Sequence, residues 1–156
     1  MAGVESAVME RWHRSKGSKI GRWLFSRGVG RFAPYTGTIG ARVKELEPGR
    51  SVVTMRDRKA VRNHLNSIHA AALTNLIELT GSLSIIASLP PETRLIPIRL
   101  ETDFVKKGRG LMTAEASCVI PATNEKAELP ATVVIRDDAG DEVARGRVTV
   151  VIGPSE

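Results

Sequence analysis

The sequence has little cysteine, few aromatic residues and no long apolar run. Cys118 is the single cysteine among 156 residues, which excludes an intrachain disulfide and a site built from several thiolates. Its place in a strand-like run indicates a small core residue. No apolar stretch reaches the roughly 20 residues of a membrane span, and the N-terminus is charged where a signal peptide is apolar. We expect a cytoplasmic protein without a metal site.

Length and composition indicate one globular domain with a hydrophobic core. The chain is 42% hydrophobic and 26% charged, as ordinary soluble domains are. Its net charge of +6 is unevenly distributed, because residues 1–33 hold seven lysines and arginines against two glutamates. The remaining 123 residues are close to neutral. The basic character therefore belongs to the first 33 residues, which we call the leader.

The leader also carries apolar residues among its charges: Val8, Trp12, Ile20, Trp23, Leu24 and Phe25. This pattern predicts one or two short amphipathic helices before Pro34, with the aromatic face packed on the rest of the protein. A basic amphipathic helix with tryptophans can also lie on an anionic membrane surface. Its basic face can equally contact the phosphates of a ligand, and the sequence leaves these alternatives open.

After residue 33 the sequence predicts strands on both sides of one long helix. Alternating apolar residues indicate strands at 39–44, 52–55, 96–104, 111–120, 131–136 and 143–152. We expect the last four to form an antiparallel meander. The helix is expected to follow Ser67 as its N-cap, to run about five turns, and to stop at Pro90-Pro91.

This order of elements favours an α+β fold. The helix is apolar over most of its circumference, with Leu73, Leu76, Ile77, Thr80 and Ala87 as its core stripe. It therefore has to be surrounded on several sides, and a curved antiparallel β-sheet wrapped around it meets that need. We expect the leader, residues 1–33, to precede this domain, residues 34–156.

Glu78 is a polar residue on this otherwise apolar helix. It lies about 150° from the centre of the core stripe. Its neighbours on that face are small or polar: Ala71, Thr74, Asn75 and Ser82. His69 is nine residues earlier, which places it on the opposite side of the helix and about 13 Å away along the axis. If the two residues serve one site, that site needs two copies of the chain, as in a two-fold dimer.

Asn63 stands six residues before His69, and Glu78 nine after it. Both spacings resemble those of the PaaI-like branch of hotdog-fold thioesterases. In that branch the loop Asn-x-x-Gly-x-x-His-Gly-Gly leads into a central helix, and an Asp or Glu follows nine residues after the His. Four further segments are similar to the DUF4442 subfamily of that superfamily: Pro34-Tyr35-Thr36-Gly37, Arg62-Asn63-His64-Leu65, Ser67-Ile68-His69-Ala70 and Phe104-Val105-Lys106-Lys107-Gly108-Arg109-Gly110. The resemblance covers about residues 34–152 and implies a hotdog fold, with a curved sheet around one long helix.

The resemblance also implies roles for the residues of the motif. The Ala70 N–H, in the first turn of the helix, would bind the oxyanion formed during thioester hydrolysis. Glu78 of the partner subunit would act as general base or nucleophile. Asn63 would hold the water or the carbonyl, and His69 would orient the loop or donate to the thioester.

The resemblance adds a group of substrate-binding residues: Asn66, Ala71, Lys106, Lys107 and Arg109. The three basic residues resemble a contact with the phosphates of coenzyme A. Asn66 replaces the family's loop glycine, and Ala70-Ala71 replace its Gly-Gly pair. Alanine keeps the N–H donor, but its methyl group narrows the approach and resists a positive φ.

Each of these residues also has a purely structural interpretation. Glu78 can form an ordinary salt bridge in a dimer, and His69 can serve only as a helix cap. His64 fits a solvated loop residue better than a ligand, because only His69 is at the motif position. Charged turns such as the one that contains Lys106 and Arg109 are usually just solvated.

The sequence therefore predicts a homodimer, or a dimer of dimers, that hydrolyses acyl-CoA or an acyl carrier protein thioester. No cofactor is expected, since coenzyme A enters as part of the substrate. One alternative is a non-catalytic hotdog protein that binds acyl-CoA or lipid. Another is a protein whose leader contacts a membrane surface or a nucleic acid, although we expect no nucleic-acid partner.

Overall fold

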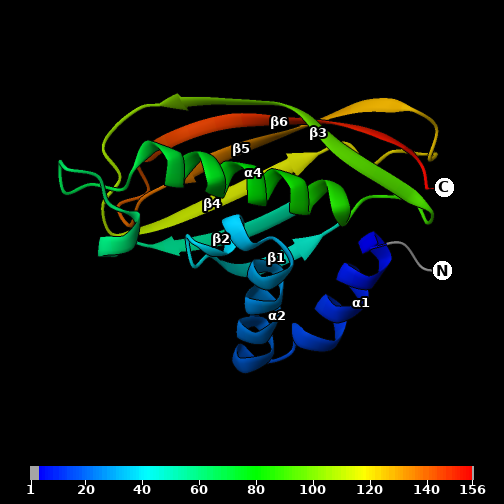
Figure 1. Cartoon of the computed structure of the whole chain (residues 1–156), viewed down its shortest axis with the longest axis horizontal. Coiled ribbons are helices and arrows are strands. Elements are labelled where there is room, and N and C mark those ends of the chain that lie inside the picture. The colour runs from blue at the N-terminus through cyan, green and yellow to red at the C-terminus, as the bar shows by residue number, and fades with distance from the viewer. Residues whose placement is uncertain (1–3, 156) are drawn as a thin grey trace.

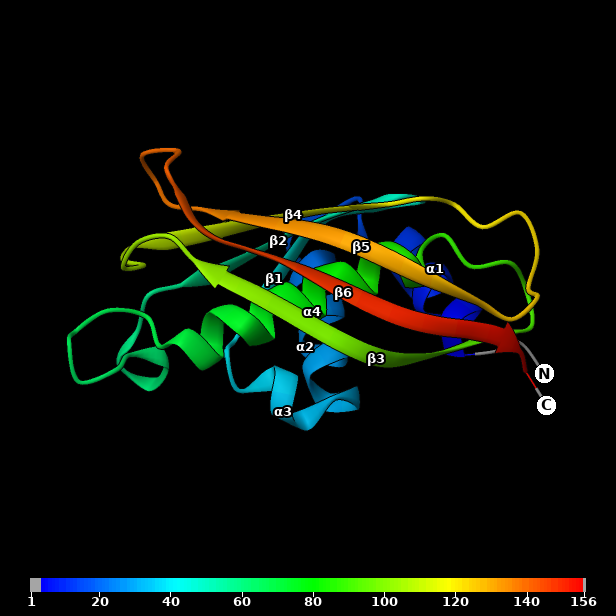
Figure 2. The same ribbon diagram turned by 90° about the horizontal axis from the view of Figure 1, so that it is seen from above.

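An antiparallel six-stranded sheet curves around the long helix α4 in the computed structural model, which describes residues 4–155 (Figures 1 and 2). The strands are β1 (Arg42–Glu47), β2 (Arg50–Arg56), β3 (Thr93–Phe104), β4 (Leu111–Cys118), β5 (Ala127–Arg136) and β6 (Glu142–Pro154). The helices are α1 (Val4–Ser15), α2 (Lys19–Phe32), α3 (Pro34–Gly37), the 3-10 helix η1 (Lys59–Val61) and α4 (Ala70–Ile86). The predicted α+β architecture is confirmed.

Helix α4 is buried along most of its length. Leu76, Ile77 and Ile85 have no exposed surface, and the whole predicted core stripe is buried. The side of α4 that faces the sheet contacts β2, β4, β5 and β6. A helix that is apolar on nearly every face is stable only when it is surrounded in this way. No helix in residues 4–155 combines the length and apolar character needed to cross a membrane.

The start of α4 differs from the prediction, since His69 and not Ser67 is the N-cap. The Nδ1 atom of His69 accepts a hydrogen bond from the Ala71 N–H at 3.0 Å. Ser67 cannot serve as the cap because its N–H and hydroxyl both donate to the Asn63 side chain. Ile68 is still extended, and its N–H donates to the Gly108 carbonyl.

The predicted four-strand meander is wrong for β3. The strand order is β1-β2-β4-β5-β6-β3, so β3 pairs with β6 and forms an edge of the sheet. The residues between β3 and β4 look like a hairpin turn in the sequence, yet they cross from the edge to the middle of the sheet. This connection is fixed from both sides: Ile68 donates to Gly108, and the Lys106 amine contacts Asp137 and Asp141 at 2.7 and 2.8 Å.

The first strand begins later than predicted, at Arg42 and not at residue 39. Gly40 has φ +63°, a left-handed conformation that interrupts an extended chain. Ile39 is nevertheless buried, with 3% of its surface exposed. The alternation of apolar residues in this segment therefore identifies its buried side chains, although only the second half of the segment is a strand.

Helix α2 packs on β1, at the edge of the sheet opposite β3, and α1 packs on α2 (Figure 1). The rings of Trp12 and Phe25 are both buried and meet edge to face, 5.1 Å between centroids. The Ser26 hydroxyl accepts a hydrogen bond from the Val43 N–H of β1. The leader thus packs part of its aromatic surface on the body, while Trp23 stays 41% exposed.

Gly146 of β6 occupies a position with no room for a side chain. A Cβ there would lie 2.3 Å from the Glu101 carbonyl oxygen and 2.9 Å from Ile77 Cγ2. We expect Gly146→Ala to lower the free energy of unfolding by about 2 kcal/mol or more, because backbone atoms would have to move. Gly153→Ala, in the same strand but with nothing within 4 Å of the added Cβ, is the matched control. Equal denaturant midpoints for the two variants would contradict this expectation.

Candidate functional site

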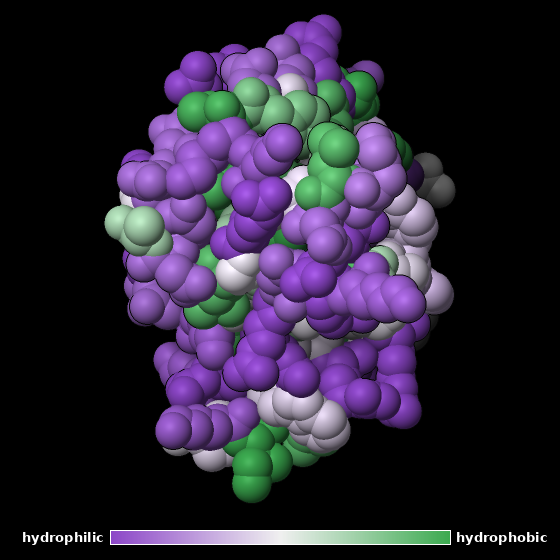
Figure 3. All heavy atoms as spheres, turned by 90° about the vertical axis from the view of Figure 1, so that its left-hand side faces the viewer, coloured by the Kyte–Doolittle hydropathy of each residue, from purple (hydrophilic) through white to green (hydrophobic). Residues whose placement is uncertain are grey.

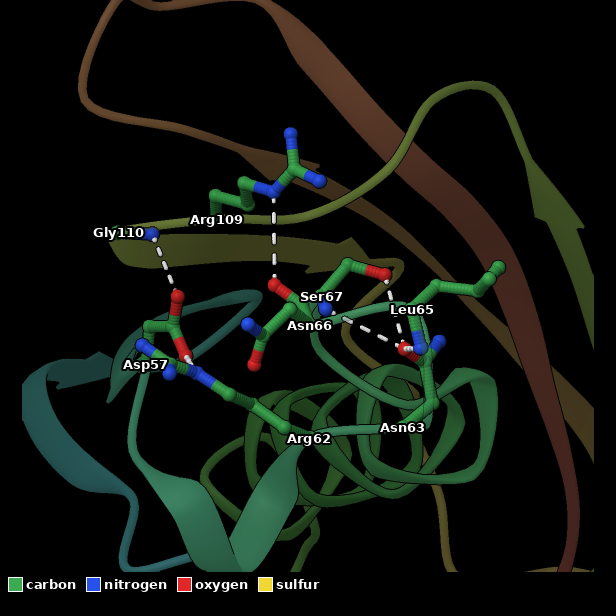
Figure 4. A network of polar contacts seen from close by, with 8 residues as sticks. All are labelled: Asp57, Arg62, Asn63, Leu65, Asn66, Ser67, Arg109 and Gly110. Atoms are coloured by element: carbon green, nitrogen blue, oxygen red, sulfur yellow. Dashed lines mark hydrogen bonds and ion pairs between the residues drawn. The ribbon is translucent and has the colours of Figure 1, made fainter.

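The loop that leads into α4 is organised by the side chain of Asn63. Its Oδ1 atom accepts hydrogen bonds from the Leu65 N–H, the Ser67 N–H and the Ser67 hydroxyl, at 2.9, 3.2 and 3.2 Å (Figure 4). The carbonyl oxygen of Asn63 is therefore engaged within the loop, and its Nδ2 amide remains as the donor. Asn66 adopts φ +58°, a left-handed conformation that asparagine tolerates better than most residues.

A second set of polar contacts ties this loop to the connection between β3 and β4 (Figure 4). Arg62 Nε donates to Asp57 at 2.6 Å, and the other Asp57 oxygen accepts from the Gly110 N–H. The hydrogen bond from Arg62 holds the pKa of Asp57 below its ordinary value. Arg109 Nε lies 3.5 Å from the Asn66 carbonyl oxygen. The chain before α4 is thus fixed by contacts to residues more than 40 positions away.

The three predicted basic residues of the crossing connection differ in their surroundings. Lys106 is ion-paired with Asp137 and Asp141, and these contacts raise its pKa. Lys107 and Arg109 are exposed. Figure 3 looks at the left-hand end of Figure 1, where the loop before α4 is placed, and shows a mostly hydrophilic face. Of the three, Lys107 and Arg109 are the residues with charge left for a ligand.

The first turn of α4 presents hydrogen-bond donors to solvent. His69, Ala70 and Ala71 are exposed. His69 Nδ1 accepts from the Ala71 N–H, so in the neutral ring the proton is on Nε2, which points a donor away from the helix. Within residues 4–155 the Ala70 N–H has no acceptor. It lies at the positive end of the helix dipole, which suits a developing negative charge.

The two alanines that replace glycines cause no backbone strain. Non-glycine residues of the described chain with positive φ are Asn66 and Glu92, and Ala70 and Ala71 begin a regular helix. The expected resistance to positive φ therefore has no consequence here. What remains of the substitution is the bulk of two exposed methyl groups beside the donor.

Glu78 lies on the side of α4 away from the core stripe, and it is half-buried. Its Oε1 atom accepts a hydrogen bond from the Ser82 hydroxyl at 3.0 Å. Burial raises the pKa of this carboxyl, and the hydrogen bond from Ser82 offsets part of that effect. Within residues 4–155 of one chain no cation pairs with Glu78. A buried carboxylate without a counter-charge is suited to take up a proton.

One chain does not bring Glu78 to the donors at the start of α4. Nine residues of regular helix separate it from His69, so the two lie on opposite sides and about 13 Å apart along the axis. The N-terminal end of α4 holds Asn63, Asn66, His69 and Ala70, while Glu78 lies at the middle of the helix. A single chain therefore holds the candidate residues in two separate groups.

The structure also has a cavity that no sequence motif predicted. A cavity of about 640 Å³ lies between α2, α3 and β1, with Arg27, Arg31 and Arg42 among its lining residues. A signal was present, since Arg27 and Arg31 are one helical turn apart on the leader. The contribution of Arg42 depends on tertiary packing and was not foreseeable.

Comparison with known proteins gives a family and a set of structural relatives. Residues 21–152 match the family model DUF4442, a domain of unknown function. A structural-genomics crystal structure is similar at 29% identity, over 98% of this chain and 100% of its own, with a TM-score of 0.82. Comparison with curated proteins found no match.

Several of the similar solved structures are described as thioesterases or probable thioesterases. A thioesterase from Haemophilus influenzae is 16% identical, covers 77% of this chain and 82% of its own, and has a TM-score of 0.67. A probable thioesterase from Pseudomonas aeruginosa is 23% identical, covers 78% and 87%, and has a TM-score of 0.69. At these identities the similarity establishes a common fold. With the family match over 132 positions, counted from residue 21 to residue 152, the chain belongs to the DUF4442 family and has the hotdog fold.

Proposed function

We propose that this protein hydrolyses acyl thioesters of coenzyme A or of an acyl carrier protein, at sites shared between two copies of the chain. The observation that carries the proposal is Glu78. It is a half-buried carboxylate outside the core stripe, with a raised pKa and no cation beside it in the described chain. A core residue would not need a charge there, and no ion pair within residues 4–155 accounts for it.

Hydrolysis of a thioester needs an activated water and a polarised carbonyl group. Glu78 supplies the base, since a carboxylate in a partly dry site accepts a proton more readily than one in water. The Ala70 N–H supplies a donor for the oxyanion, at the positive end of α4. His69 Nε2 and Asn63 Nδ2 are further donors at the same end of the helix, available to the carbonyl or to the water.

The edge strand β3 supports a homodimer that joins these two groups of candidate residues. Ile96, Ile98 and Leu100 of β3 are 57, 50 and 42% exposed, on a strand with one unpaired edge. Such an edge invites pairing with a second copy, which would cover the apolar side chains. In a two-fold pair each α4 lies antiparallel to its partner, so Glu78 of one copy can approach the start of α4 in the other. A dimer of dimers would use the same pair twice.

Release of free thiol from short, medium, long and aromatic acyl-CoA esters tests this function. We expect turnover of at least one ester class by the full chain, with a chain-length preference. A flat result across the panel, combined with thermal stabilisation by the same esters, would favour the non-catalytic binder and contradict hydrolysis of coenzyme A esters. The observation that favours this second candidate is the pair of exposed methyl groups, Ala70 and Ala71, beside the oxyanion donor.

A further inference from the structure

The geometry points to a separate anion site: we propose that the cavity between α2, α3 and β1 binds the phosphate group of an organic ligand. The cavity has a volume of about 640 Å³. Sites for small organic molecules commonly measure roughly 300 to 1,000 Å³. It is formed by α2, by α3 and the residues that follow it, and by the start of β1, with Leu79 as the contribution of α4. None of the residues proposed above for hydrolysis lines it.

The charges around the cavity are all of one sign. Arg27, Arg31 and Arg42 line it, and no lining residue is acidic. Within residues 4–155 none of these three arginines has an ion-pair partner. Arg58 reaches the same rim, where its guanidinium donates to the carbonyl of Thr38. Surface arginines usually have acidic neighbours, so an uncompensated group of three facing a cavity indicates a negatively charged occupant.

Arg42 has an incomplete set of hydrogen bonds. Its Nη1 atom is buried and has no hydrogen-bond partner in the described chain. Burial lowers the pKa of this guanidinium, and the charges of Arg27 and Arg56 lower it further. A buried donor without an acceptor destabilises the fold. An anion in the cavity would provide the acceptor and would offset the repulsion among the arginines.

Two of the arginines are held in position by an aromatic ring. The guanidinium carbons of Arg27 and Arg42 lie 5.2 and 5.6 Å from the ring centroid of Trp23. Contacts of this kind restrict arginine side chains that would otherwise be mobile in solvent. The two cations are therefore positioned before a ligand arrives. Planar guanidinium groups match the oxygens of a phosphate, and a dianion compensates several arginines better than a monoanion does.

The remaining walls of the cavity suit the apolar portion of an organic ligand. Val29, Val43 and Leu79 contribute aliphatic side chains. Gly30 and Gly37 bring α2 and α3 into backbone contact, since a Cβ on Gly37 would lie 2.5 Å from the Gly30 carbonyl oxygen. The wall there consists of backbone. The cavity therefore presents cations at one part and an apolar lining at another, as a phosphate ester with a less polar body requires.

The cavity adjoins the stretch of α4 that carries Glu78. Leu79 follows Glu78 directly, and one turn earlier the Asn75 side chain lies 3.4 Å from the Tyr35 carbonyl of α3. Figure 2 shows α2 and α3 on the side of α4 that faces away from the sheet. Coenzyme A and phosphopantetheine both carry phosphates. Identifying the ligand as the carrier of the thioester rests on the proposed function, whereas the phosphate site itself does not.

Calorimetric titration of the full chain with coenzyme A and with pyrophosphate tests the proposal. We expect both to bind, and Arg42→Gln to weaken binding of both at least ~10-fold because a bidentate donor is lost. Arg27→Gln combined with Arg31→Gln should do the same, and it replaces two exposed residues whose loss does not disturb the core. Arg11→Gln, on an exposed position of α1 outside the cavity, removes the same charge and should bind as the unchanged protein does.

Three results would overturn the inference. The first is that neither probe binds at millimolar concentration. The second is equal affinity in the arginine variants and in Arg11→Gln, which would place the phosphate elsewhere. The third is binding of octanoate in preference to both phosphates, which would make the site one for carboxylates.

Titration separates this inference from the proposed function. Loss of phosphate binding in the arginine variants of a protein that hydrolyses no thioester would support the phosphate site and contradict the function. Thioester turnover in the same variants, with unchanged binding of pyrophosphate and coenzyme A, would support the function and contradict the phosphate site.

Discussion

Replacement of Glu78 by glutamine is expected to lower thioester turnover at least ~100-fold, because the amide cannot accept the proton that a general base removes from water. The change keeps the shape of the side chain, and glutamine can still accept the hydrogen bond from the Ser82 hydroxyl. The fold and any dimer should therefore survive. The measurement is kcat for the best ester of the panel, with chain folding checked by thermal melting.

Glu128→Gln is the matched control for this variant. Glu128 is an exposed residue of β5, so the substitution removes the same charge from a solvent-facing position outside the candidate residues. We expect it to keep full turnover. Near wild-type turnover in the Glu78 variant, with correct folding, would remove this carboxylate from the mechanism and leave the start of α4 as the only candidate centre.

The pH dependence of the same proteins gives an independent reading of Glu78. Its folded pKa is raised by burial, so kcat/KM should fall on the acid side at a pH above the ordinary glutamate value of 4.5. The effect of Glu78 on how the free energy of unfolding depends on pH is opposite in sign to that of a salt-bridged carboxylate. A raised folded pKa favours the fold below the unfolded pKa, and this contribution is lost as the pH rises through the folded pKa. Glu78→Gln should therefore be at least as stable as the unchanged protein at neutral pH.

The sequence predicted α4 and the six strands because both signals are local. Apolar alternation identifies a strand wherever one face is buried, and a helix apolar on most sides has to be central. The position of β3 in the sheet was not predictable, because the residue pattern of a strand does not indicate which strand it pairs with. Residues 105–110 have the composition of a hairpin turn, but they form a crossing connection. It is held by the ion pairs of Lys106 with Asp137 and Asp141 and by the hydrogen bond from the Ile68 N–H to the Gly108 carbonyl.

The sequence proposed the members of the candidate site, and the structure adds local contacts that the sequence did not indicate. The spacing of Asn63, His69 and Glu78 drew attention to the segment that leads into α4. It did not show that Ser67 is engaged by Asn63, which leaves His69 to cap α4. The N-cap of α4 depends on which hydrogen bonds Ser67 makes with its neighbours. The cap preference of a single residue type does not contain this information. The arginine cavity forms only when α2, α3 and β1 are in place, so the sequence indicated the pair Arg27 and Arg31 but not the contribution of Arg42.

Equal mixing of inactive Asn63→Ala and Glu78→Ala proteins is expected to restore about a quarter of the wild-type activity per chain, if each site takes one residue from each copy. After exchange, half of the dimers are hybrids. Each hybrid has one site with both changes and one site with neither. Asn63→Ala should be inactive alone, because the loop that presents His69 and Ala70 loses three hydrogen bonds to one oxygen.

Subunit exchange has to be measured in the same samples, for example with a tag on one variant and native mass determination of the mixture. Verified hybrids without recovered activity would mean that Asn63 and Glu78 serve the same site within one chain, since a hybrid then has no intact site. Helix geometry makes that outcome difficult to reconcile with direct action of both residues on one carbonyl, because about 13 Å of α4 separates His69 from Glu78. Recovery near a quarter would instead establish that the two groups of candidate residues in the single chain are halves of one active site.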